Sequence, residues 1–115
     1  MKINITEFNP DLDIIYFKGN LVLSTIQNTK NVLQNYLSNN DKNVVLDLSD
    51  IDYADSSGLS VIVNFYKQLS SKNKKMTISG MSPKIKVLFK LMRLDEAFIV
   101  NNDIDYTHLN VKVFD

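Results

Sequence analysis

Apolar residues recur along this chain with the short period of strands and the longer period of helices, in alternating blocks. Short blocks rich in β-branched and aromatic residues predict strands at residues 3–8, 14–17, 44–48, 76–79 and 98–100. The turn sequence Asn9-Pro10-Asp11 joins the first two strands, while Gly19 ends the second strand and Gly80 ends the fourth. The third block is almost continuously apolar, as expected of a strand covered on both faces.

Longer blocks with helical spacing lie between these strands. The first opens with Ser24 and Gln27 at the spacing of a capping box and stops at Asn39-Asn40-Asp41. Its apolar positions fall on roughly one face and are Ile26, Leu33, Tyr36 and Leu37. In the second block, residues 59–69, Val61-Ile62-Val63 favours a strand by propensity, but the length and the apolar spacing favour a helix.

The third helical block follows the fourth strand. Ser82 is placed as its N-cap, with Pro83 at the first helical position. Its apolar stripe consists of Ile85, Leu88, Phe89 and Met92. The tail at residues 104–115 is either a short helix or an added strand.

This order of elements predicts an α/β fold. We expect one domain over residues 1–115, with a mixed, mostly parallel sheet of about five strands and helices packed on it. In such sheets the loops at the carboxyl ends of parallel strands share one edge, which is the usual ligand or partner surface. Residues 19–24, 49–58 and 80–83 are therefore expected to be neighbours in space.

Composition narrows the class of protein. The 115 residues suffice for one core, and 13 basic residues balance 13 acidic ones, so a nucleic-acid partner is not expected. No apolar run approaches the ~18 residues that a membrane span needs. The chain has no cysteine, and its first residues lack the layout of a secretory signal. We expect a cytoplasmic protein without a membrane partner.

Aspartates in and after the third strand raise the possibility of a metal site or an aspartyl phosphoacceptor; they are Asp47, Asp50, Asp52 and Asp55. A phosphoacceptor site of the response-regulator kind needs an acidic pair after the first strand and a lysine after a late one. Lys18 and Gly80 stand at the comparable strand ends. These aspartates are better explained as turn formers and helix-entry charges, so no metal is predicted.

Catalytic motifs are also missing. Asp55-Ser56-Ser57-Gly58 is not a nucleophile elbow, and the chain contains no P-loop pattern. The sole histidine, His108, lies in the tail. We therefore predict that the chain is not an enzyme and needs no cofactor.

The start of the second helix is the remaining candidate for a functional site. Ser56 can cap this helix and Gly58 can relax its first turn. A helix N-terminus also presents free N–H groups and a partial positive charge, so it can carry a phosphate on Ser56 without unfolding. The residue chemistry allows both roles and does not choose between them.

The chain resembles a known family in three stretches. Residues 44–59, which read VVLDLSDIDYADSSGL, are similar to the signature of STAS domains, specifically the bacterial anti-sigma factor antagonists. Residues 80–89, GMSPKIKVLF, with Leu94 and Phe98 following, match the second recognisable stretch of the family. Gly19-Asn20-Leu21 matches its earlier Gly-x-Leu loop. The resemblance covers the domain from the second strand to about Val100.

The resemblance implies a function. The unphosphorylated protein would bind an anti-sigma factor, typically a serine kinase of the histidine-kinase-like ATPase fold, and so release a sigma factor. That kinase would phosphorylate the first serine after the aspartate, here Ser56, and a metal-dependent serine phosphatase would reverse the step. The partner-binding residues carried over with the motifs are Asp55, Ser57, Gly58, Leu59, Gly19, Asn20, Leu21, Val22 and Ser82.

One position departs from the family pattern. The Gly-x-Leu is often followed by an aspartate, and this chain has Val22 there, followed by Leu23. These two residues either make an apolar contact with the partner or are partly buried. Alternatives that keep the fold are a scaffold of the stressosome type or an accessory subunit of a lipid-transport complex. A small-ligand sensor is a further alternative.

Overall fold

The computed structural model describes residues 1–91 and 99–100 of the chain. Its elements are β1 (Lys2–Asn9), β2 (Leu12–Leu21), α1 (Ile26–Asn39), β3 (Asn43–Ala54), α2 (Ser56–Ser71), β4 (Met76–Ser79), α3 (Pro83–Leu91) and β5 (Ile99–Val100). This is the predicted order, and residues 59–69 are helical as expected. The predictions for Met92, Phe98 and the tail fall outside the described residues.

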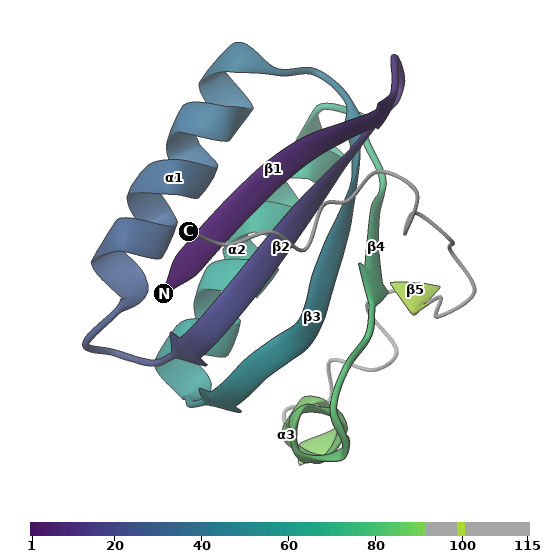
Figure 1. The fold of residues 1–115 in the computed structure, drawn as a ribbon. Coiled ribbons are helices and arrows are strands. Elements are labelled where there is room, and N and C mark those ends of the chain that lie inside the picture. The colour runs from purple at the N-terminus through teal and green to yellow at the C-terminus, as the bar shows by residue number, and fades with distance from the viewer. Residues whose placement is uncertain (92–98, 101–115) are drawn as a thin grey trace.

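The described strands form one sheet in the order β1-β2-β3-β4-β5. β1 pairs antiparallel with β2, and the remaining neighbours pair in parallel. The prediction of a mixed, mostly parallel sheet is therefore confirmed. In Figure 1 the arrowheads of β2, β3 and β4 point the same way, and α3 lies at the end of the sheet where the arrowheads of β2 and β3 lie.

The core lies between the sheet and the pair α1 and α2, which cover the same face (Figure 1). Alternate residues of β2 point to opposite faces, so Ile15 and Phe17 belong to this main core, whereas Ile14 and Tyr16 pack with Val45 in a second cluster. All four of these β2 side chains are buried. The central strands are thus buried on both faces, as the continuous apolar run in β3 predicted.

Both central strands run further than predicted. β2 passes through Gly19, whose φ of +118° suits glycine, and ends at Leu21. β3 continues to Ala54, with Ile51 and Ala54 still buried, although the sequence from Ser49 onward has the polar composition of a loop. Pairing between β2 and β3 extends to Leu21 and Ala54, with register shifts on the way. Ladder hydrogen bonds and burial on the inner face therefore outweigh the local turn propensity.

Two helix caps also differ from the prediction, each by one residue. α1 begins at Ile26 with Thr25 at the N-cap position, so Ser24 is not its cap. α2 begins at Ser56 and is capped by Asp55, not by Ser56. The predicted start of α3 is confirmed, because Ser82 Oγ accepts a hydrogen bond from the N–H of Ile85 at 3.3 Å.

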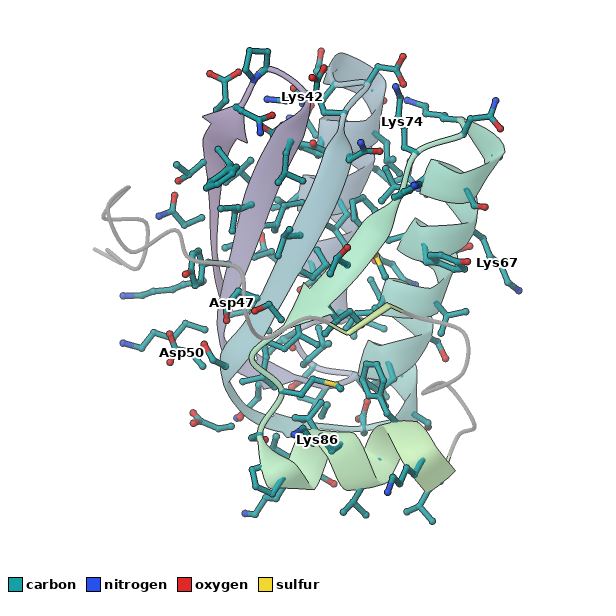
Figure 2. The ribbon with its side chains drawn as sticks, turned by 90° about the vertical axis from the view of Figure 1, so that its right-hand side faces the viewer. Lys42, Asp47, Asp50, Lys67, Lys74 and Lys86 are labelled. Carbon is teal, nitrogen blue, oxygen red and sulfur yellow. The ribbon has the colours of Figure 1, made fainter. Side chains whose placement is uncertain are left out.

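A cluster of polar side chains lies at the amino ends of the parallel strands, and we call Glu7, Asp13, Tyr36 and Lys42 the amino-end cluster. Asp13 is only 5% exposed. It accepts a 2.7 Å hydrogen bond from Tyr36 Oη, and its other oxygen is paired with Lys42, which also bonds Glu7 at 3.1 Å. Figure 2 shows Lys42 at the opposite end of the molecule from Lys86 of α3. No described helix is long and apolar enough to cross a membrane.

Candidate functional site

Backbone contacts join the loops that follow β2 and β3. The N–H of Asp55 donates to the carbonyl of Leu21 at 3.2 Å, and the N–H of Leu23 donates to Asp55 Oδ2 at 3.1 Å. The loop after β4 lies beside β3, because a methyl group placed on Gly80 would come 2.8 Å from Ser49 Cβ. The expected meeting of the three loops at one edge of the sheet is confirmed, most directly for the first two.

Asp55 is the centre of this arrangement. Its Oδ1 accepts a 2.9 Å hydrogen bond from the N–H of Gly58, which caps α2, and its Oδ2 accepts from Leu23. The hydrogen bond from Gly58 lowers the pKa of Asp55 most; partial desolvation opposes it, and the N–H groups of Leu23 and Ser57 lower the pKa further. Asp55 is therefore an ionised structural acceptor that joins α2 to the loop after β2.

Gly58 is required by a close approach of two backbones. A Cβ atom at this position would lie 1.8 Å from the carbonyl oxygen of Leu21. A backbone oxygen cannot turn aside as a side chain can, so any other residue would push α2 away from the end of β2. The first turn of α2 and the loop after β2 thus form one rigid unit. We call residues 55–58 of this unit the helix start.

The loop before α1 is held by a residue that the motif did not indicate. Thr25 Oγ1 donates to the carbonyl of Asn20 at 2.7 Å and accepts from the N–H of Val22 at 3.2 Å. The sequence does contain one indication of this turn, because Thr25 directly follows the predicted cap Ser24 and threonine hydroxyls hydrogen-bond to the backbone in such turns. Leu23 is 68% exposed beside this turn, whereas Val22 is partly buried.

The residues carried over from the family motif fall into two groups. Ser56 is exposed and Ser57 is partly buried, so the helix start presents these two hydroxyl side chains differently. Leu21 and Leu59 are each 1% exposed, and their side chains belong to the core and not to the surface. Ser82 caps α3 through the N–H of Ile85.

The aspartates of β3 differ in burial. Asp47, only 2% exposed, accepts from the N–H of Ser49 at 2.8 Å and also from its hydroxyl. Asp52 is exposed at the surface. The described residues contain no group of three or more acidic or histidine side chains arranged to hold a metal ion.

Together these features define a small α/β module whose exposed edge carries a serine on a rigidly held helix start. Residues 4–108 match the family model of the STAS domain. The chain is also 26% identical over 102 residues to the anti-sigma-B factor antagonist of Listeria monocytogenes, a match that covers 89% of this chain and 90% of that protein.

Solved structures agree in fold. An anti-sigma factor antagonist from Mycobacterium paratuberculosis superposes with a TM-score of 0.79 at 16% identity, covering 97% of this chain and 94% of that one. The phosphorylated form of the Bacillus cell fate determinant SpoIIAA superposes with a TM-score of 0.68 at 12% identity, covering 89% and 93%.

The chain belongs to the STAS domain family, since the family match spans most of its length. The relative and the Mycobacterium structure described above are both named as anti-sigma factor antagonists. The STAS family that the three stretches of sequence indicated is thereby confirmed.

Proposed function

We propose that this chain is a cytoplasmic anti-sigma factor antagonist whose binding is controlled by phosphorylation of Ser56. In its unphosphorylated form it sequesters an anti-sigma factor that is a serine kinase of the histidine-kinase-like ATPase fold. Phosphorylation by that kinase ends the contact, and a metal-dependent serine phosphatase restores it. The chain is the substrate in this cycle and catalyses no step of its own.

The observation that carries the proposal is the exposure of Ser56 on a helix start that is fixed on both sides. Asp55, the preceding residue, bonds the backbone of Leu23 and of Gly58. Ser56 itself is exposed, whereas its neighbour Ser57 is partly buried. A kinase needs an accessible hydroxyl in a defined position, and of the two serines Ser56 fits that need better.

Electrostatics at the helix start support a role for phosphate as an off signal. The first turn of a helix presents free N–H groups, so the fold tolerates an added anion there. A phosphate adds about 1.5 to 2 negative charges. It would lie beside Asp55, whose lowered pKa keeps the carboxylate ionised at neutral pH. Phosphorylation thus concentrates negative charge on the contact surface while leaving the fold intact.

Incubation with ATP and the histidine-kinase-like serine kinase of the same organism tests the assignment. We expect one phosphate per chain by intact mass, located at Ser56 by peptide mapping. Ser56→Ala should remove the label, whereas Ser57→Ala, one residue away, should keep it. Equal labelling of Ser56→Ala and the parent would show that Ser56 is not the acceptor. Failure of the kinase to bind or label the parent would favour a scaffold or lipid-transport role.

Ser56→Asp is expected to separate binding from folding. An acidic side chain at the first position of α2 suits the helix dipole, so the free energy of unfolding should stay within about 0.5 kcal/mol of the parent. Affinity for the kinase, measured by calorimetry, should fall at least tenfold. A loss of stability without a loss of affinity would mean that Ser56 serves the fold and not the contact.

A further inference from the structure

A groove runs along the seam between α1 and α2, on the side of the helices away from the sheet. It begins at Ser57 and Ser60 in the first turns of α2. Farther along the seam, Gln34 Nε2 donates a 3.2 Å hydrogen bond to Gln68 Oε1 and bridges the two helices. We call this space the interhelix groove. Besides these four side chains, it is lined by Lys30, Leu33, Val61, Phe65 and Lys67. It therefore starts one residue from Ser56.

The interhelix groove has an apolar floor and cationic rims. Leu33, Val61 and Phe65 line it and are buried beneath it. Lys30 of α1 and Lys67 of α2 also line it, and both are exposed. Figure 2 shows Lys67 projecting from α2 into solvent.

The positive charge of the interhelix groove is local. Its lining residues include no carboxylate. Neither Lys30 nor Lys67 takes part in a salt bridge within residues 1–91. The whole chain has a formal net charge of zero, so these two cations do not reflect a generally basic protein. The complementary ligand carries negative charge on both sides of an apolar group.

The shape and charge select one class of ligand. A flat bilayer cannot reach the floor of a groove between two helices, and two lysines give little attraction for nucleic acid, which is bound through many phosphate contacts. A protein segment with an apolar side chain flanked by aspartate or glutamate satisfies both the floor and the rims.

We propose that the interhelix groove receives an acidic segment, carrying an apolar side chain, of the same kinase that contacts Ser56. This inference rests on the proposed function and extends its contact surface along the helices. It also gives the phosphate a target: Ser56 adjoins Ser57 at the end of the groove, so a phosphate there repels the near end of an acidic segment seated in it. Phosphorylation then repels the bound segment without moving the fold.

Charge reversal on the rims tests the groove. The full chain carrying Lys30→Glu or Lys67→Glu is titrated with the kinase that labels Ser56, in the presence of a non-hydrolysable ATP analogue. Each variant should bind about tenfold more weakly at low salt, with a smaller difference at high salt. Lys75→Glu makes the same change of charge at an exposed site outside the groove and should bind like the parent.

Phosphorylation kinetics distinguish failure of the groove from failure of the proposed function. Both rim variants should still accept phosphate at Ser56 with an unchanged kcat and a raised KM. If the kinase labels Ser56 and binds the rim variants as tightly as the parent, the groove inference is wrong and the proposed function stands. If the kinase does not bind the parent, both fall together. A change of oligomeric state in the rim variants alone, seen by ultracentrifugation, would assign the groove to a second copy of the chain and overturn the inference.

Discussion

Asp13 and Asp55 lie at opposite ends of the same sheet, and each is the acceptor around which its end is organised. Asp13 is buried and is satisfied by side chains, those of Tyr36 and Lys42. Asp55 is only partly buried and is satisfied by backbone N–H groups of Gly58 and Leu23. Asp13 and its partners form a buried polar cluster at one end of the sheet. Asp55 instead holds the backbone of an exposed surface at the other end.

The two ends are therefore expected to differ in how much each contributes to the free energy of unfolding. If one member of a buried ion pair or hydrogen bond is removed, its partner is left out of water with its charge or polarity uncompensated. A helix-capping carboxylate at the surface can be replaced by water at a smaller cost. We therefore expect changes in the amino-end cluster to affect unfolding alone, and changes in the helix start to affect binding as well. The predictions below test that division, beginning with the largest effect.

Asp13→Ala should have the largest effect on stability. It leaves the ammonium of Lys42 and the hydroxyl of Tyr36 without their shared acceptor, and removal of one partner from a buried pair costs about 3 kcal/mol or more. Urea unfolding measures this loss, with Asp11→Ala in the nearby exposed turn as the matched control, expected within about 0.5 kcal/mol. Kinase affinity of the folded fraction should stay unchanged. A binding loss as large as that of Ser56→Asp would show that the two ends are coupled.

Gly58→Ala should affect both stability and binding. The added methyl group would overlap the carbonyl of Leu21, so α2 or the loop after β2 must shift, at a cost of about 2 kcal/mol. The same shift breaks the geometry that Asp55 maintains, and the rate of Ser56 phosphorylation should fall with it. Ser70→Ala, at an exposed position of the same helix outside the interhelix groove, is the control and should leave both quantities near the parent. Unchanged stability would contradict the close approach of the backbones of Gly58 and Leu21.

The two ends also differ in how much of them could be predicted from the sequence. The residues of the helix start are adjacent in the sequence. Asp55, Ser56 and Gly58 could therefore be located from the four-residue motif Asp55-Ser56-Ser57-Gly58 and from the strand and helix on either side of it. Only the cap was misassigned, since aspartate and serine are both favourable N-caps and stand side by side.

The amino-end cluster has no such local pattern. Tyr36 and Lys42 lie 23 and 29 positions from Asp13 in the sequence and meet it only after the sheet and α1 have packed. No periodicity or spacing marks such a contact. The extension of β3 to Ala54 escaped prediction for the same reason, because pairing with β2 decides it and the polar residues after Leu48 argue locally for a loop.

The dependence of stability on pH gives the smallest and most selective test. The pKa of Asp55 is lowered in the folded state, so its contribution is fully present above its ordinary value near 3.8 and is lost as the pH falls through the folded pKa. Replacing Asp55 by asparagine, which keeps an acceptor for the cap, should flatten this acid limb in urea unfolding curves. An acid limb unchanged by Asp55→Asn would assign that limb to other carboxylates.

The alkaline limb belongs to the other end of the sheet. Burial raises the pKa of Tyr36, and the hydrogen bond and charge of Asp13 raise it further. Burial lowers the pKa of Lys42, but its bonds to Asp13 and Glu7 outweigh burial and the net shift is upward. For both groups the contribution to stability is present below the ordinary values of 10.0 and 10.5 and is lost as the pH rises through the folded values.

Lys42→Met should therefore flatten the alkaline limb of the unfolding free energy and leave the acid limb in place, the reverse of Asp55→Asn. Because each substitution removes one titrating group from one end of the sheet, the pair of curves compares the two ends within one fold. If both variants flattened the same limb, the assignment of separate roles to the two ends would be wrong.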